Sequence, residues 1–236
     1  MWNSPCNRCA VMSKSIFSNI EKADMIELDS KKITTLYKKG QKIYHLGQTP
    51  IGVYCLSNGI IKLSKLGENG KEQIVRFAKA GELLGIRAMM ADKKYMTTST
   101  AIEDSLVCFV GKRAFFKLCL KYPYISQKIM KSLSYLLGEA EDKMTSMAQK
   151  SVRERLAQNL LMLSCLFKTG STDCEDPSNG IISLSREDIA NIVGTATETV
   201  IRILSDFKEE NLIEIKGRKI IIHNADGLRR IIKTHL

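Results

Sequence analysis

The sequence predicts an α+β protein that begins with an antiparallel β jelly roll, continues into a long helix and ends in a winged helix-turn-helix. Short β-rich runs punctuated by glycine extend from about residue 33 to residue 110, a pattern typical of rolls and barrels. Residues 112–148 then carry apolar side chains at helical spacing. Residues 184–219 contain two short amphipathic segments around Gly194, followed by a hairpin pattern.

The first 30 residues open with Cys6 and Cys9, in a Cys-x-x-Cys spacing, and continue into a segment with helical apolar spacing. After them, β-branched runs alternate with Lys-Gly, Asn-Gly and Ala-Gly turns, which predicts antiparallel strands. A short helix beginning near residue 112 should stop at Pro123.

The long helix carries apolar residues that step by 4, 3, 4, 4 and 3 positions. This spacing resembles the heptad pattern of paired helices, so we predict a dimer interface on this stripe. The alternative is a helix that packs on its own domain. The stripe consists of Ile129, Leu133, Leu136, Ala140, Met144 and Met147.

The two C-terminal helices have the start and stop signals of a helix-turn-helix. Ser185 can cap the first helix, and Gly194 permits the tight turn that follows it. The second helix should run from about Thr197 to Lys208. Its buried face is predicted to consist of Val200, Ile203, Leu204 and Phe207.

The opposite face of the second helix carries Thr197, Glu198, Ile201 and Arg202, in the half that enters the major groove in this motif. Arg202 can donate two hydrogen bonds to guanine, Glu198 can accept from cytosine, and Ile201 suits a thymine methyl group. Two simpler alternatives are an ordinary Glu198–Arg202 surface pair and a capping box formed by Thr195 and Glu198.

Two β-branched runs, Leu212–Ile215 and Lys219–Ile222, flank a Lys-Gly-Arg tip and predict the hairpin that forms the wing. Cations at such a tip suit phosphates better than bases. We therefore expect phosphate contacts from Arg186, Lys216, Arg218 and Lys219.

Composition limits the other possibilities. The chain has 236 residues, 44% of them hydrophobic, and no apolar run long enough for a membrane span. We expect a cytoplasmic protein with no membrane partner.

Seven irregularly spaced cysteines argue against a disulfide scaffold. Of the net charge of +11, residues 150–236 carry only +1, so total charge adds little to the argument for DNA binding. No phosphate loop, nucleophile elbow or metal-spaced cluster indicates an enzyme.

The run IANIVGTATETVIRILSDFKEENLI, followed by GRKIIIHN, resembles the winged helix of the CRP/FNR family of bacterial transcription regulators. The pattern KKGQKIYHLG…VYCLSNGIIKL is similar to that family's cyclic-nucleotide-binding roll. In the family, a glutamate and, four residues later, an arginine contact bases; Glu198 and Arg202 match them. The catabolite activator branch has arginine where Thr197 stands, and the FNR branch has serine where Ile201 stands.

The resemblance implies a homodimer that binds palindromic double-stranded DNA and contacts RNA polymerase, through surfaces that include the loop 168–180. It implies a sensor domain over residues 1–121, a dimerisation helix over 122–149 and a DNA-binding domain over 150–236. Besides an enzyme, the alternative function is a ligand-binding or protein-interaction module that uses the winged helix for protein contacts.

The effector is not expected to be cyclic AMP. The family's cyclic AMP pocket uses a glutamate, where this chain has Ile86, and an Arg-Ser pair, where it has ADKKYMTT. An apolar residue leaves the ribose hydroxyl unpaired, and a lysine does not reproduce the arginine fork. The candidates for an effector pocket are Ile86, Arg87, Lys93 and Lys94.

FNR proteins hold an iron–sulfur cluster through three N-terminal cysteines and one on the last strand of the roll. Cys6, Cys9 and Cys108 match three of these positions, and Ser15 stands at the remaining one. Because such clusters are usually held by four thiolates, an intact cluster requires Cys55 or Cys119 as a substitute. We favour a vestigial or thiol-redox site, or a small molecule bound in the roll.

Overall fold

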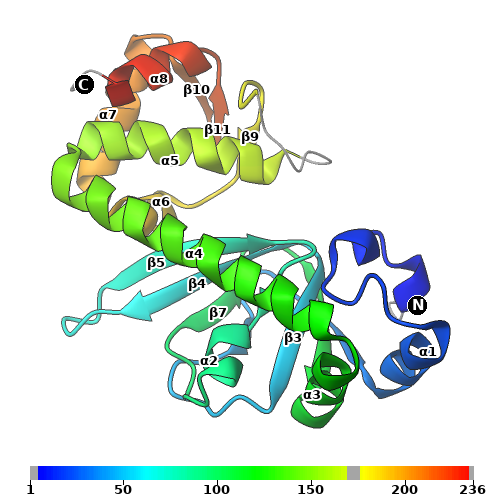
Figure 1. Cartoon of the computed structure of the whole chain (residues 1–236). Helices are drawn as coiled ribbons and strands as arrows, with labels where there is room; N and C mark the ends of the chain where they lie inside the picture. The colour runs from blue at the N-terminus through cyan, green and yellow to red at the C-terminus, as the bar shows by residue number, and fades with distance from the viewer. Residues whose placement is uncertain (1–4, 169–175, 234–236) are drawn as a thin grey trace. The chain divides into compact units, whose positions relative to one another are not determined.

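The computed structural model describes residues 5–168 and 176–233 (Figure 1). The chain divides into two compact units, one ending at Glu139 and the other beginning at Ala140. The boundary falls inside one long helix, where the sequence predicted a separate segment over residues 122–149. Residues 169–175, in the loop expected to contact RNA polymerase, lie outside the described residues.

The N-terminal unit contains two four-stranded antiparallel sheets, which confirms the predicted jelly roll. One sheet has the order β1 (Ile33–Tyr37), β8 (Ser105–Gly111), β3 (Gly52–Asn58) and β6 (Leu83–Leu84). The other has the order β2 (Lys42–Tyr44), β7 (Thr98–Ala101), β4 (Ile60–Leu66) and β5 (Glu72–Lys79). Helix α2 (Ile86–Met90) connects β6 to β7.

Two hydrophobic cores lie on opposite faces of the β1-β8-β3-β6 sheet. Leu56 and Val107 belong to a core that contains residues of both sheets, whereas Val53 and Val110 belong to one that contains Phe17 of the N-terminal segment. This division follows from the alternation of side chains along a strand. The outer face of the sheet is thus covered by the chain that precedes the roll.

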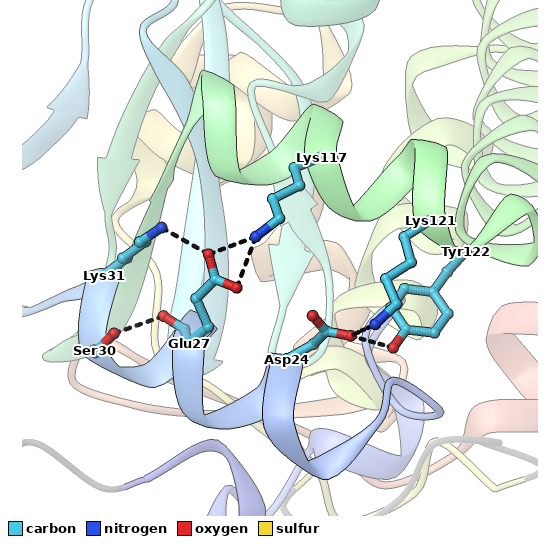
Figure 2. Close-up of polar contacts among 7 residues, drawn as sticks. All are labelled: Asp24, Glu27, Ser30, Lys31, Lys117, Lys121 and Tyr122. Carbon is cyan, nitrogen blue, oxygen red and sulfur yellow. Dashed lines mark hydrogen bonds and ion pairs between the residues drawn. The ribbon is translucent and has the colours of Figure 1, made fainter.

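The N-terminal part of that cover consists of two short 3₁₀ turns, η1 (Cys6–Arg8) and η2 (Met12–Lys14), and helix α1 (Lys22–Lys31). Phe115, Leu118 and Ile125, from the two helices that follow the roll, pack into the same core. Ion pairs join α1 to α3 (Lys112–Lys121), as Figure 2 shows. Glu27 binds Lys117, and Asp24 binds Lys121 with 2.6 Å between Oδ2 and Nζ. The hydroxyl of Tyr122 also donates to Asp24.

Helix α4 (Pro123–Gln149) begins where α3 was expected to stop. Its predicted dimer stripe requires a correction at the first position: Ile129 is only 2% exposed and lies in the core beneath the N-terminal segment. Leu133 packs partly against the same core. The alternative of packing on its own domain therefore holds for the start of this helix.

The C-terminal unit is a winged helix-turn-helix. Its helices are α5 (Val152–Phe167), α6 (Arg186–Val193), α7 (Thr197–Glu209) and α8 (Ala225–Lys233). Its sheet has the order β10 (Ile213–Lys216), β11 (Lys219–Ile222) and β9 (Ile181–Ile182). The second helix and the wing lie within one residue of their predicted bounds, whereas β9 and α8 were not predicted.

Within the described part of the chain, no helix is both long enough and apolar enough to cross a membrane.

Candidate functional site

Helix α7 separates a buried face from an exposed one, as predicted. Its buried residues are Val200, Ile203, Leu204 and Phe207. Glu198, Ile201 and Arg202 are exposed, with Ile201 at 49%, and Thr197 is half-buried. An amphipathic helix thus presents its amino-terminal half, with an acidic, an apolar and a basic side chain, to a binding partner.

The two simpler alternatives for Glu198 are not realised. Neither a hydrogen bond nor an ion pair joins Glu198 to Arg202 in the part of the chain that the structure describes. The N-cap of α7 is Ala196, and no side chain caps the helix, so Thr195 and Glu198 do not form a capping box. Both charged groups are therefore available to a ligand.

The turn before α7 is fixed by side chains on either side of it. Ser185 Oγ accepts from the backbone N–H of Asp188 at 2.9 Å and caps α6, and Gly194 ends that helix with a φ of 75°. Arg155, on α5, donates to the carbonyl oxygens of Val193 at 3.1 Å and Gly194 at 3.5 Å. The role of Arg155 was not predicted, because no spacing in the sequence relates it to the turn.

A second arginine of α5 holds the far end of α7. Arg153 binds Glu210 with 2.6 Å between Nη2 and Oε2. Its guanidinium lies over the ring of Phe207, 4.6 Å from the centroid. Two arginines in the first turn of α5 thus contact the turn before α7 and the carboxyl end of α7.

The four residues expected to contact phosphate gather around the wing, but two of them already have protein partners. Arg186 donates to the carbonyl oxygens of Arg218 at 3.4 Å and Gly217 at 3.5 Å, and burial lowers its pKa. Lys216 pairs with Glu214 at 3.0 Å. Arg218 and Lys219 are exposed, so they are the cations best placed for phosphates. Arg186 positions the tip that carries them.

Tyrosines pack together in the core of the roll that contains residues of both sheets. The rings of Tyr44 and Tyr95 stack with centroids 3.9 Å apart, and Tyr54 lies 5.8 Å from Tyr44. Tyr95 packs against Gly85, where an added Cβ would come within 3.1 Å of the ring. Desolvation by burial raises the pKa of Tyr95.

The predicted effector residues lie in different surroundings. Ile86 is 6% exposed and belongs to the core beneath the N-terminal segment. Arg87, Lys93 and Lys94 are exposed. No signal in the sequence indicated the tyrosine cluster that lies inside the roll.

A cavity lies between the N-terminal segment and the outer face of the β1-β8-β3-β6 sheet. It contains about 690 Å³ of empty space, including solvent at its mouth. Four cysteines from three parts of the chain line it, and we call it the thiol pocket: Cys6, Cys9, Cys55 and Cys108. Cys55 on β3 and Cys108 on β8 are direct cross-strand partners. The remaining wall is mainly apolar.

Polar partners surround three of these thiols. The buried Lys32 donates to Cys6 Sγ at 3.3 Å and lies 2.7 Å from Asp29 Oδ1. A hydroxyl lies beside each of two others: Ser57 Oγ is 3.4 Å from Cys9 Sγ, and Thr34 Oγ1 is 3.5 Å from Cys108 Sγ.

Burial and the hydrogen bond to Asp29 raise the pKa of Cys6 to about 11, and burial also raises the pKa of Cys55. Across residues 5–168 and 176–233, no three His, Cys, Asp or Glu side chains are arranged to hold one metal ion.

Comparison with known proteins matches each of the two units to a known domain family. A family model described as a Crp-like helix-turn-helix domain matches residues 154–231, and one described as a cyclic nucleotide-binding domain matches residues 34–122. Two fumarate and nitrate reduction regulatory proteins, from Shigella dysenteriae and Vibrio cholerae, are 28% and 29% identical over 230 residues. Each alignment covers 96% of this chain and 89% of the relative.

Solved structures agree. FixK2 from Bradyrhizobium japonicum is 25% identical with a TM-score of 0.73, over 85% of this chain and 96% of that one. A regulator from Eubacterium rectale, 18% identical with a TM-score of 0.74, shares the fold over 92% of this chain and 97% of its own.

The two models match the roll and the helix-turn-helix, and the regulators match almost the whole chain. The protein is thus a DNA-binding transcription regulator with a cyclic-nucleotide-binding-like sensor domain, and not an enzyme. It belongs to the CRP/FNR family of transcription regulators.

Proposed function

We propose that this regulator acts as a homodimer on a palindromic operator and responds to an effector other than cyclic AMP. The observation that carries the proposal is the exposed amino-terminal half of α7, with Glu198, Ile201 and Arg202 unpaired toward solvent. Arg202 would bind guanine O6 and N7, Glu198 would accept from a cytosine amino group, and Ile201 would contact a thymine methyl group. Arg218 and Lys219 would bind phosphates beside the groove.

The dimer interface that the exposed residues of α4 favour differs from the predicted stripe at two positions, where Met130 replaces Ile129 and Leu137 replaces Leu136. Apolar residues step by 3, 4, 3, 4 and 3 positions along one face of the helix, which is exposed except at Leu133, where the side chain packs partly against the core. We call this set the exposed seam: Met130, Leu133, Leu137, Ala140, Met144 and Met147. Met130 is 60% exposed, Leu137 61% and Met144 66%. A strict heptad stripe of this kind suits a second copy of the same helix.

A homodimer explains why the operator would be palindromic. Two copies related by a two-fold axis present two α7 helices, and half-sites about 34 Å apart place both in major grooves on one side of the duplex. Each half-site would contain the same G·C-containing step, contacted by Glu198 and Arg202.

Three features of the roll favour an effector other than cyclic AMP. The stacked rings of Tyr44 and Tyr95 occupy its interior, and Ile86 offers no acceptor to a ribose hydroxyl. Lys93 and Lys94 are exposed, and a lysine lacks the planar fork that binds a phosphate through two hydrogen bonds.

Selection of bound duplexes from a random library tests the proposal. We expect enriched sites to contain two inverted copies of one G·C-containing element, 10 to 10.5 base pairs apart or a multiple of that spacing, as in other helix-turn-helix dimers. Destroying one copy should weaken binding, and affinity should fall steeply with salt. Binding that ignores the second copy would contradict the dimer. Failure to enrich any sequence would favour the protein-interaction alternative.

Titration calorimetry with cyclic AMP should give no heat of binding.

A further inference from the structure

The thiol pocket is a mainly apolar space that the chain leaves open to solvent. It contains about 690 Å³ of empty space, including solvent at its mouth. Protein interiors normally leave few voids larger than a water molecule. Pockets that bind small molecules, by contrast, are mostly apolar and measure about 300–1,000 Å³. The lining and size of the thiol pocket therefore resemble those of a ligand site more than those of a packed core.

The cysteines add to the apolar character of its wall. Burial and the hydrogen bond to Asp29 raise the pKa of Cys6 to about 11, and burial raises the pKa of Cys55, so both are neutral thiols at neutral pH. A neutral cysteine behaves as a small hydrophobic side chain, and methionine sulfur packs favourably against aromatic rings. Met12 brings such a sulfur to the same cavity. The wall thus suits an aromatic ligand.

The polar groups on the wall already have protein partners. The ammonium of Lys32, only 3% exposed, lies 2.7 Å from Asp29 Oδ1 and donates to Cys6 Sγ at 3.3 Å. The hydroxyl oxygen of Ser57 lies 3.4 Å from Cys9 Sγ. An anionic ligand would have to displace these contacts or be buried without a counter-charge, which is costly. The pocket therefore favours a neutral ligand.

We propose that the thiol pocket binds a small, neutral aromatic molecule, and that this molecule is the effector of the regulator. The second part rests on the proposed function and deepens it, whereas the first part concerns binding to the free chain. The site lies outside the roll, on the face of the β1-β8-β3-β6 sheet that the N-terminal segment covers.

The position of the pocket gives its ligand a route to α4. Ser15 and Phe17, of the N-terminal segment, line the cavity. Lys128 of α4 donates to the carbonyl oxygen of Ser15, with 3.5 Å between the two atoms. A ring bound against this segment would thus alter contacts made by the helix that carries the exposed seam.

Two adjacent threonines of β1 provide a matched pair of variants. Thr34 lines the pocket and lies opposite Cys108 in the sheet, whereas Thr35 is exposed and is not among the residues that line it. Thr34→Phe should place a ring inside the pocket. Thr35→Phe adds the same ring to the same strand outside the pocket, and phenylalanine suits a strand at either position.

Fluorescence titration of the full chain with N-phenyl-α-naphthylamine, a neutral aromatic probe, tests the proposal. We expect saturable binding of equal affinity in wild type and Thr35→Phe. Thr34→Phe should bind the probe at least about tenfold more weakly, because burial of one aromatic ring accounts for a change of that size. Anilinonaphthalenesulfonate, the same molecule with an added sulfonate, tests the class of ligand. Its affinity should be equal in wild type and Thr34→Phe.

Three results would overturn the proposed site or its class of ligand. The site is removed if wild type shows no saturable binding of the neutral probe, or if Thr34→Phe binds that probe as wild type does. The neutral class is removed if Thr34→Phe weakens binding of the sulfonate as much as binding of the neutral probe. Circular dichroism checks folding, and Ser57→Phe blocks the cavity from β3 if Thr34→Phe is unfolded.

Labelling of wild type with N-ethylmaleimide tests the site without any substitution. The neutral probe should slow modification of Cys9, which lines the pocket, and leave Cys119 unchanged. Cys119 is a half-buried cysteine of the same unit that does not line the pocket. Equal slowing of both cysteines, or of neither, would contradict binding in the pocket.

Gel shifts test the role as effector. The neutral probe should change the affinity of wild type for its selected palindrome and leave that of Thr34→Phe unchanged. A probe that binds the pocket without changing DNA affinity would overturn the role as effector and leave the site in place. The proposed function is tested separately, because selection of a palindromic site needs no probe.

Discussion

Lys128, on the first turns of α4, donates a hydrogen bond to Ser18 in the N-terminal segment, with 2.8 Å between Nζ and Oγ. A second link follows nearby, because the hydroxyl of Tyr122 accepts from the backbone N–H of Glu21 at 3.0 Å. The same segment carries Cys6 and Cys9 of the thiol pocket, and α4 carries the exposed seam. A change in the pocket can thus reach the helix through the segment between them.

Loss of the Lys128 ammonium should loosen this link. Lys128→Met keeps the apolar stem but removes the donor to Ser18, so we expect faster amide hydrogen exchange across residues 9–18. Mass spectrometry of exchanged peptides measures the change. Lys131→Met, at an exposed position on the same helix, is the control and should leave that exchange unchanged. Equal exchange in wild type and both variants would show that the hydrogen bond does not hold the segment.

The α1–α3 contact predicts a dependence of stability on pH. Hydrogen bonds from Lys121 and Tyr122 lower the pKa of Asp24 below its ordinary value (Figure 2). Because the folded-state pKa is the lower one, the contribution is complete above the unfolded pKa of about 3.9 and disappears as pH falls through the folded value. Urea midpoints of wild type and Asp24→Asn should therefore differ at pH 7 and converge toward pH 3. A difference in urea midpoint that stays constant over this range would show that the substitution acts through side-chain packing and not through the charge of Asp24.

Arg155 should matter to stability more than Arg153, although both lie on the first turns of α5. Arg155→Ala removes donors to the carbonyl oxygens of Val193, Gly194 and Lys150. Of these three residues only Val193 is buried, and a buried acceptor left unsatisfied costs about 1–3 kcal/mol. The carboxylate partner of Arg153 is Glu210, an exposed residue, and exposed pairs contribute about 0–1 kcal/mol. Chemical denaturation of the two variants compares them, and a larger loss in Arg153→Ala would contradict the role assigned to Arg155.

The DNA-binding half was largely predictable because its helices have one buried and one exposed face. The 3.6-residue period predicted all four buried residues of α7, and Gly194 indicated the turn. The strand β9 was missed because two residues, Ile181 and Ile182, are too few to show a period. The contacts of Arg155 could not be predicted either, since they depend on how α5 packs against the turn.

For the sensor half, the sequence predicted the jelly roll but not which side chains face the pocket or the exposed face of α4. Apolar residues occur in adjacent pairs along α4, such as Ile129 with Met130, so the sequence alone did not show which member packs inward. The thiol pocket depends on strand register, which places Cys55 opposite Cys108. Fifty-two residues separate them in the sequence, and no local pattern indicates that they meet.

Arg202→Ala should relax the sequence specificity of DNA binding. Loss of a two-bond contact to guanine costs about 1–3 kcal/mol at one base pair, so the variant should bind the operator and its substituted form with similar affinity. Gel shifts with duplexes carrying all four base pairs at that position measure the effect. Lys208→Ala, at the exposed carboxyl end of α7, should preserve the wild-type preference. An equal loss on every duplex would identify Arg202 as a phosphate contact.

Leu137 and Ile129 should have opposite effects on assembly and folding. Leu137 is 61% exposed on the seam, so Leu137→Glu should place a charge in the proposed interface and yield a folded monomer with weakened binding to the palindrome. Ile129→Ala should instead destabilise the N-terminal unit by about 2–5 kcal/mol, the usual cost of emptying a core position. Sedimentation velocity and denaturation curves distinguish the two outcomes. A dimeric Leu137→Glu protein would place the interface elsewhere. A stable but monomeric Ile129→Ala protein would show that the originally predicted stripe forms the contact.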